Sequence, residues 1–179
     1  MGADLESSER ATPAQDHGQG RTACAPAPEP TLIAVLAASE PLQLLPALRA
    51  LGHEIQLFGP EEIGELAGWS VGLMVVDQDS LGGPEIVRGL RLLDGHARTP
   101  ILLVASGEAG TIRREASVLG ATEVLVRPLD ILELQMRARA LIELSLARRD
   151  AERVTRTMSR HVAAWWPNRR RASARSSSA

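Results

Sequence analysis

The stretch VGLMVVDQDSLGG, residues 71–83, runs from an apolar segment directly into Asp77. A continuous apolar run of this length, without alternation, is typical of a strand that is buried on both faces of a sheet. The aspartates and glycines that follow indicate that the strand ends there and that a turn begins. Asp77 is therefore predicted to lie at the end of a central strand, where it either carries chemistry or simply terminates the strand.

The same pattern of an apolar run followed by a helical segment is repeated on both sides of this stretch. The predicted strands are 31–37, 53–58, 71–76, 100–105 and 122–126. The predicted helices are 40–52, 60–68, 84–95, 109–120 and a long last helix from about residue 130. Strand–helix alternation with short connections predicts an α/β fold with a doubly wound five-stranded parallel sheet. Five strands suit the flavodoxin-like order 2-1-3-4-5, here with an extended C-terminal helix.

Composition divides the chain into four parts. Residues 1–30 hold few large apolar side chains and are expected to be disordered, because they cannot bury enough surface to offset their ordering entropy. The folded domain is predicted for residues 31–145. A helical extension follows over residues 146–166, and residues 167–179 form a polar, basic tail that is expected to be disordered.

The helical extension has a weak seven-residue repeat. The residues that form it are Leu144, Ala147, Ala151, Val154, Met158 and Trp165, and His161 breaks the series. About three weak heptads are near the minimum for a coiled coil, so a homodimer through the last helix is one expectation. The alternative is a solvated helix that frays after Leu146. The adjacent Trp165 and Trp166 favour a contact with a partner or a second copy.

Charge and hydropathy exclude several classes of function. The net charge is −2, which favours neither an acidic nor a basic partner, and the short basic tail alone does not indicate nucleic-acid binding. No segment is long and apolar enough to span a membrane, and residues 1–30 lack the apolar core of a signal peptide. We therefore expect a cytoplasmic protein with no membrane partner. All 20 basic residues are arginine, so an arginine can stand where related proteins have lysine.

Functional residues in an open parallel sheet gather at the carboxyl ends of its strands. The candidates at these positions are Ala38, Ser39, Glu40, Asp77, Gln78, Asp79, Ala105, Ser106, Arg127 and Pro128. None of the histidines shows metal-ligand spacing with another histidine or with Cys24.

The order of elements, the VVDQD segment around Asp77 and the LGATEVLVRP segment at 119–128 resemble the receiver (CheY-like) domains of two-component response regulators. The resemblance covers residues 31–145 in a divergent form. It implies a phosphorelay in signal transduction, in which a histidine kinase transfers a phosphoryl group to the aspartate after the third strand. Asp77 matches this phosphoacceptor.

The resemblance also implies a Mg²⁺ site formed by an acidic pair after the first strand. The matching positions are Ala38 and Ser39, with Glu40 just beyond them. Mg²⁺ is a hard cation that needs oxygen ligands, commonly one or two carboxylates with waters. We therefore expect no metal site, with Asp77 and Asp79 as the ligands if one exists, and no other cofactor.

Three further family positions have changed. The hydroxyl residue that ends the fourth strand is replaced by Ala105, followed by Ser106, and the aromatic residue of the fifth strand by Val124. The lysine before a cis-proline corresponds to Arg127 before Pro128, which keeps the positive charge. We expect Arg127 to form an ion pair with Asp77 in place of a phosphoryl contact.

These replacements favour an atypical receiver module that is not an enzyme and that acts by protein–protein interaction, with phosphorylation weak or lost. Two alternatives stay open. One is a genuine phospho-accepting response regulator that uses Asp77 with a histidine kinase as partner. The other is a flavodoxin-like domain that binds a small molecule.

Overall fold

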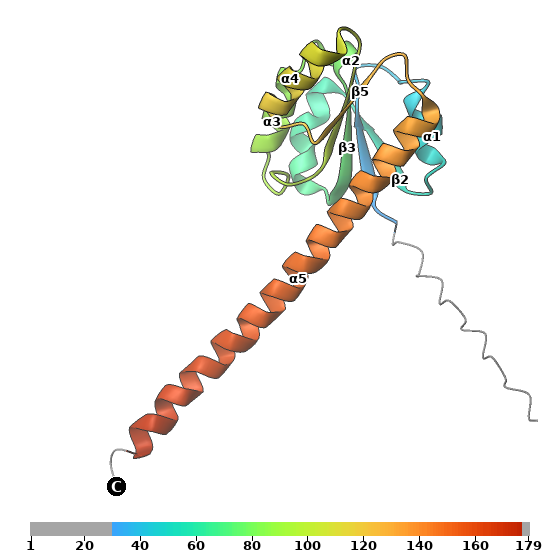
Figure 1. The fold of residues 1–179 in the computed structure, drawn as a ribbon. Coiled ribbons are helices and arrows are strands. Elements are labelled where there is room, and N and C mark those ends of the chain that lie inside the picture. The colour runs from blue at the N-terminus through green and yellow to red at the C-terminus, as the bar shows by residue number, and fades with distance from the viewer. Residues whose placement is uncertain (1–29, 177–179) are drawn as a thin grey trace, which may run out of the picture.

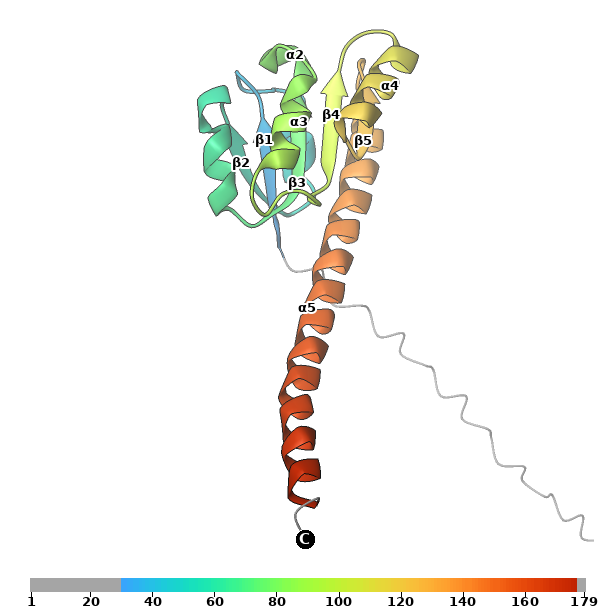
Figure 2. The ribbon, with the colours of Figure 1, turned by 90° about the vertical axis from the view of Figure 1, so that its left-hand side faces the viewer.

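The structure is a computed structural model that describes residues 30–176, with side chains for residues 30–160. The strands are β1 (Leu32–Leu36), β2 (Glu54–Phe58), β3 (Val71–Asp77), β4 (Ile101–Ala105) and β5 (Glu123–Val126). The helices are α1 (Leu44–Arg49), the 3₁₀ helix η1 (Pro60–Gly68), α2 (Gln78–Leu81), α3 (Glu85–Leu92), α4 (Ala109–Leu119) and α5 (Ile131–Ser176). Figures 1 and 2 show a three-layered domain from which α5 projects as a long rod.

The five strands form one sheet in the order β2-β1-β3-β4-β5, and every pair is parallel. The doubly wound, flavodoxin-like fold predicted from the sequence is therefore confirmed. Alternate residues of the strands enter two separate hydrophobic cores. One core lies against α1 and α5, and the other lies against η1, α3 and α4. Burial on both faces explains the unbroken apolar runs in β1, β3 and β4.

The pairing of β1 with β3 shifts by one residue at Gly72. Leu32 lies opposite Val71, whereas Ile33 lies opposite Leu73. A Cβ atom on Gly72 would lie 2.4 Å from the Oγ1 atom of Thr31, so only glycine fits at this close approach of the two strands.

Several local expectations were wrong in detail. The edge strand β2 exposes alternate residues, because one of its two faces is only partly covered. The four-residue helix α2 directly after Asp77 was not predicted, because four residues show no periodicity. Helix α1 begins at Leu44 and not at residue 40, so that Pro46 lies in its first turn, where proline is tolerated.

Helix α5 begins after Asp130, whose Oδ1 atom accepts hydrogen bonds from the backbone N–H groups of Leu132 (2.7 Å) and Glu133 (3.1 Å). Its first part is docked on the sheet through the buried residues Leu134, Ala138, Leu141, Ile142 and Ser145. From residue 150 to residue 160 every side chain is exposed. The helix continues to Ser176, so its backbone covers the 146–166 extension and residues 167–176, where the composition predicts disorder.

The boundaries of 1–30, 31–145, 146–166 and 167–179 stay predictions, and the first 29 residues and residues 177–179 lie outside the described part of the chain. Within the described part, no helix is long and apolar enough to cross a membrane.

Candidate functional site

The carboxyl ends of β1, β3, β4 and β5 meet at one edge of the sheet, and the predicted site residues lie there. Asp77 is the last residue of β3, and Ala105 is the last residue of β4. Arg127 follows β5 directly, and its backbone N–H donates a 2.9 Å hydrogen bond to the carbonyl oxygen of Ala105. The Arg127–Pro128 peptide bond is cis, as the resemblance implied.

Asp77 is a buried carboxylate whose side chain is paired with Arg127. Only 7% of Asp77 is exposed, and its Oδ2 atom lies 3.0 Å from the Nη2 atom of Arg127. This ion pair was expected from the sequence and is present in the structure. The second carboxylate oxygen, Oδ1, is buried and has no hydrogen-bond partner.

The same guanidinium group also contacts Asp79. Its Nε atom lies 3.0 Å from Oδ2 of Asp79. Asp79 in turn accepts two hydrogen bonds from Ser106, from the backbone N–H to Oδ1 (2.9 Å) and from the hydroxyl to Oδ2 (2.7 Å). Arg127 therefore bridges two carboxylates, and Ser106 holds the second one in place. We call the four residues Asp77, Asp79, Ser106 and Arg127 the arginine bridge.

The charge of Asp79 is stabilised by these contacts. Partial burial would raise the pKa of the Asp79 carboxyl, but the hydrogen bonds from Ser106 and the guanidinium of Arg127 lower it more, so that the pKa falls below its usual value of 3.8. Asp79 is therefore an anion at neutral pH and forms an ion pair with Arg127.

Ser80 links the end of β3 to the loop after β1. Its hydroxyl donates to the carbonyl oxygen of Asp77 (3.1 Å) and accepts from the backbone N–H of Ala38 (3.1 Å). Sequence reasoning missed this bridge, and it missed the Ser106–Asp79 pair. The only available signal for both was the clustering of hydroxyl residues at the strand ends.

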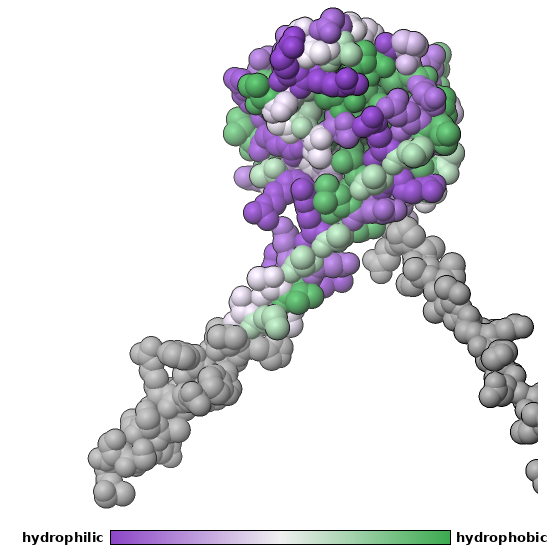
Figure 3. All heavy atoms as spheres, in the orientation of Figure 1, coloured by the Kyte–Doolittle hydropathy of each residue, from purple (hydrophilic) through white to green (hydrophobic). Residues whose placement is uncertain are grey.

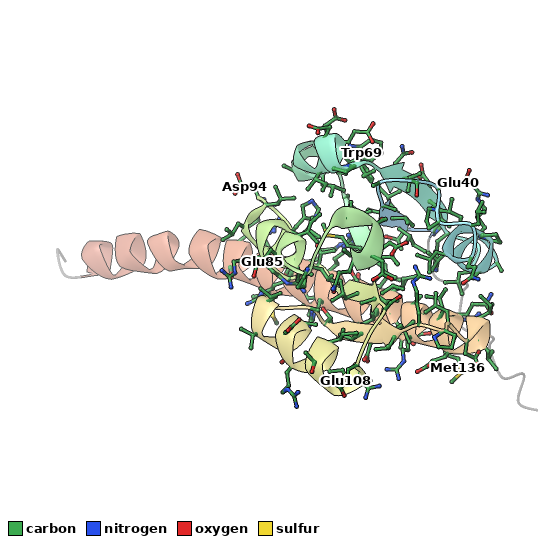
Figure 4. The ribbon with its side chains drawn as sticks, turned by 90° about the horizontal axis from the view of Figure 1, so that it is seen from above. Glu40, Trp69, Glu85, Asp94, Glu108 and Met136 are labelled. Carbon is green, nitrogen blue, oxygen red and sulfur yellow. The ribbon has the colours of Figure 1, made fainter. Side chains whose placement is uncertain are left out.

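The residues after β1 do not complete a magnesium site. Ala38, Ser39 and Glu40 are all exposed, and Glu40 (Figure 4) forms no ion pair in the described part of the chain. No group of three acidic, histidine or cysteine side chains among the described residues is placed to hold a metal ion. The two available carboxylates, Asp77 and Asp79, already share one guanidinium group. This donor set does not fit Mg²⁺, which needs several free oxygen ligands in octahedral geometry.

The two remaining altered positions lie inside the domain. Ala105 is completely buried and carries no hydroxyl group that could meet a ligand at the end of β4. Val124 is half-buried and packs against the core formed with α3 and α4. Ser106, one residue beyond Ala105, has the hydroxyl group, but it is directed to Asp79.

Several solved structures have a similar fold. CheY4 of Vibrio cholerae, a chemotaxis response regulator, is 19% identical, with a TM-score of 0.56 over 63% of this chain and 98% of that chain. The signal receiver domain of an HD domain-containing protein from Pseudomonas fluorescens is 18% identical, with a TM-score of 0.60 over 72% and 98% of the two chains.

The chain has the receiver-domain fold. A third structure with this fold is the receiver domain of a sensor histidine kinase from Pseudomonas aeruginosa, in which a magnesium ion is coordinated in the active-site cleft. It is 18% identical, with a TM-score of 0.54 over 64% of this chain and 98% of that chain. No protein-family model matches the sequence, and no curated protein matches it. At this low identity the receiver fold is shared while the side chains of the site are free to differ.

We predict that Arg127→Ala destabilises the protein, because it leaves the buried carboxylate of Asp77 unpaired. The expected loss in the free energy of unfolding is about 3 kcal/mol, the low end for a broken buried ion pair, since the Arg127 side chain is 26% exposed. Urea denaturation measures it. Asp77→Asn/Arg127→Ala should recover part of the loss. An unchanged unfolding midpoint for Arg127→Ala would show that the Asp77–Arg127 ion pair does not stabilise the fold.

We also predict that the contribution of Asp79 to stability depends on pH. Because its pKa is lowered in the folded state, the stabilisation is fully present above the unfolded value near 3.8 and is lost as the pH falls through the folded value. The difference in unfolding free energy between the wild type and Asp79→Asn should therefore be constant from pH 7 to pH 5 and shrink below pH 4. A difference that stays constant to pH 3 would contradict this assignment.

Proposed function

We propose that this chain is an atypical receiver module of a cytoplasmic signalling pathway, which binds a protein partner in one fixed conformation while phosphorylation of Asp77 is weak or lost. The observation that carries the proposal is the arginine bridge. The contacts that a phosphoryl group and a metal ion would make to Asp77, to a basic residue and to a hydroxyl are made here by protein side chains alone.

Charge balance argues against efficient phosphorylation. Phosphoryl transfer depends on positioning and on neutralising the charge that develops around the phosphorus atom. The site holds two carboxylates and one guanidinium, so it is negative before any phosphate arrives. A phosphoryl group would have to draw Arg127 away from both carboxylates, without the metal ion that normally offsets the added charge.

One observation supports the alternative of a genuine phospho-accepting regulator. The Oδ1 atom of Asp77 accepts no hydrogen bond in the described part of the chain, so this oxygen could act as a nucleophile once a movement of the surrounding residues exposes it. A histidine kinase would then be the partner. Arg127 would have to break its contact with Asp79 and then pair with the phosphoryl group, as the family's lysine does. The free energy needed to break that contact therefore distinguishes the two functions.

A second copy of the chain is the partner that α5 supports most directly. Leu144, Ala147, Ala151, Val154 and Met158 form a ridge of exposed apolar side chains, which we call the α5 ridge; Val154 is 58% exposed and Met158 67%. Figure 3 shows apolar residues along α5 where it leaves the domain. Most of the stability of a helix in a protein comes from the packing of its apolar face, and a seven-residue repeat suits a coiled coil.

The first experiment on the function is a two-dimensional amide NMR spectrum of the full chain, titrated with Mg²⁺ and then with beryllofluoride. We expect the signals of Asp77, Ala105 and Arg127 to stay in place at millimolar Mg²⁺, because the bridge already satisfies the charges. Arg127→Ala is the matched variant with an open site. Shifts that cluster at these residues in the wild type and vanish in Asp77→Asn would contradict the proposal and favour a phospho-accepting regulator.

The dimer is tested separately by sedimentation equilibrium of the full chain. Met158→Glu places a charge on the α5 ridge and should raise the dissociation constant at least tenfold, about the effect of burying an unpaired charge. Arg156→Glu changes the charge on the opposite side of the helix and serves as the control, with little effect expected. A wild type that stays monomeric at hundreds of micromolar would contradict the dimer and leave the NMR result unaffected.

A further inference from the structure

A hollow of about 600 Å³ lies at the opposite end of the sheet from Asp77, where the strands begin. Its walls come from three separate segments, namely the turn from η1 into β3, the loop before β4, and α5. Ser145 of α5 and the buried His96 of the loop line it. The His96 ring is held within hydrogen-bond distance of the Leu66 carbonyl oxygen (2.7 Å) and the Thr99 hydroxyl (3.2 Å), so this side of the hollow is rigidly built.

The hollow is strongly basic although the whole chain carries a net charge of −2. Its titratable lining other than His96 is Arg98, Arg148, Arg149 and Glu152. A second hollow of about 530 Å³ shares Arg98, Arg148 and Glu152 with the first and adds Arg91. The two hollows together are therefore lined by four guanidinium groups and a single carboxylate. An excess of positive charge at this density favours an anionic ligand with several oxygen atoms.

One of these arginines, Arg91, has a structural role, whereas the other three keep N–H donors that are available to a ligand. Arg91 donates through all three of its nitrogen atoms, to Gly120, Thr99 and Thr122, and ties together the loops before β4 and β5. Arg148 and Arg149 each donate to one backbone carbonyl, of Arg98 and Val71, which fixes the side chains but leaves most of their five donors free. The Arg98 side chain is 81% exposed, and its one ion pair within the described part of the chain is with Glu152, at 3.6 Å.

The positive charges also repel one another. Burial and the nearby charge of Arg148 lower the pKa of Arg91. A bound anion would relieve this repulsion, so the free hollow is electrostatically prepared for a ligand.

One wall of the hollow is aromatic. Trp69, which follows η1 at the edge of the domain (Figure 4), is 43% exposed. Phe58 packs edge-to-face against its ring, with the ring centroids 5.9 Å apart, and so fixes its orientation. An exposed, oriented indole offers a flat surface for a planar ring. Guanidinium groups and an aromatic wall in one hollow of this volume match a ligand that carries both phosphates and a planar base.

We propose that this hollow binds a nucleotide, with the phosphates held by Arg98, Arg148 and Arg149 and the base against Trp69. The site is separate from Asp77, and the proposal does not depend on the arginine bridge. Because Arg148 and Arg149 belong to α5 just before its exposed part, an occupied hollow would fasten α5 to the starts of β3 and β4. The ligand would thereby stabilise the base of the projecting helix.

The test is isothermal titration calorimetry of the full chain with ATP, GTP and tripolyphosphate at low salt. We expect at least one nucleotide to bind more tightly than tripolyphosphate, which has the charges but no base. Arg98→Ala should weaken nucleotide binding about tenfold, the loss of one charge-assisted hydrogen bond, and added salt should weaken it further. Arg113→Ala, an exposed arginine of α4, is the control and should bind like the wild type.

Trp69→Phe and Trp69→Ala separate stacking from charge, and thermal unfolding of each variant checks that it is folded. Nucleotide affinity should fall from tryptophan to phenylalanine to alanine, while tripolyphosphate affinity stays the same. The proposal is overturned if no nucleotide binds at millimolar concentration, or if Arg113→Ala weakens binding as much as Arg98→Ala. Equal affinity for tripolyphosphate and the nucleotides would reduce the hollow to a general polyanion site and overturn the assignment of the base to Trp69.

Discussion

One guanidinium group between two carboxylates controls the carboxyl edge of this sheet. Arg127 comes from the end of β5, Asp77 from the end of β3 and Asp79 from α2, so a single side chain joins three segments. Ser106 adds the end of β4 through its two hydrogen bonds to Asp79. An arginine can do this because its planar fork offers donors in two directions, whereas the ammonium group of a lysine is a point charge. Replacing lysine by arginine at this position therefore changes the geometry of the site even though the charge is kept.

The fold could be predicted from strand periodicity, whereas the Asp77–Arg127 pair was predicted from the resemblance to receiver domains. Apolar runs locate the strands, and a parallel sheet brings their carboxyl ends to one edge. Strand β4 lies between β3 and β5, so the contact also needs the long side chain of Arg127. The role of Asp79 could not be predicted, because its direction depends on the short helix α2. The hydrogen bonds by which Ser80 links Asp77 to Ala38 could not be predicted either, because they join two loops whose conformation no sequence pattern specifies.

The basic hollow at the other edge was equally invisible in the sequence. Arg91, Arg98, Arg148 and Arg149 are spread over nearly sixty positions, and in a chain whose basic residues are all arginine none of them is conspicuous. They meet because α5 crosses the sheet from its carboxyl edge to its amino edge, starting just after Arg127 and reaching the hollow near Ser145. His96 illustrates the same limit, because a histidine in a loop gives no sign that it will be buried and bonded on both ring nitrogens.

Helix α5 thus connects the two edges of the sheet and carries the exposed ridge beyond them. Its docked residues, including Leu134, Ala138 and Ile142, are buried in the same core as β3 and β4, so this part cannot shift without disturbing the interior. The arginine bridge holds the segment that enters the helix, and the basic hollow lies beside the part of α5 that leaves the domain. A module built in this way presents the α5 ridge at a fixed angle. Under the functions proposed above, its output is set by the molecules that occupy the ridge and the hollow rather than by a change at Asp77.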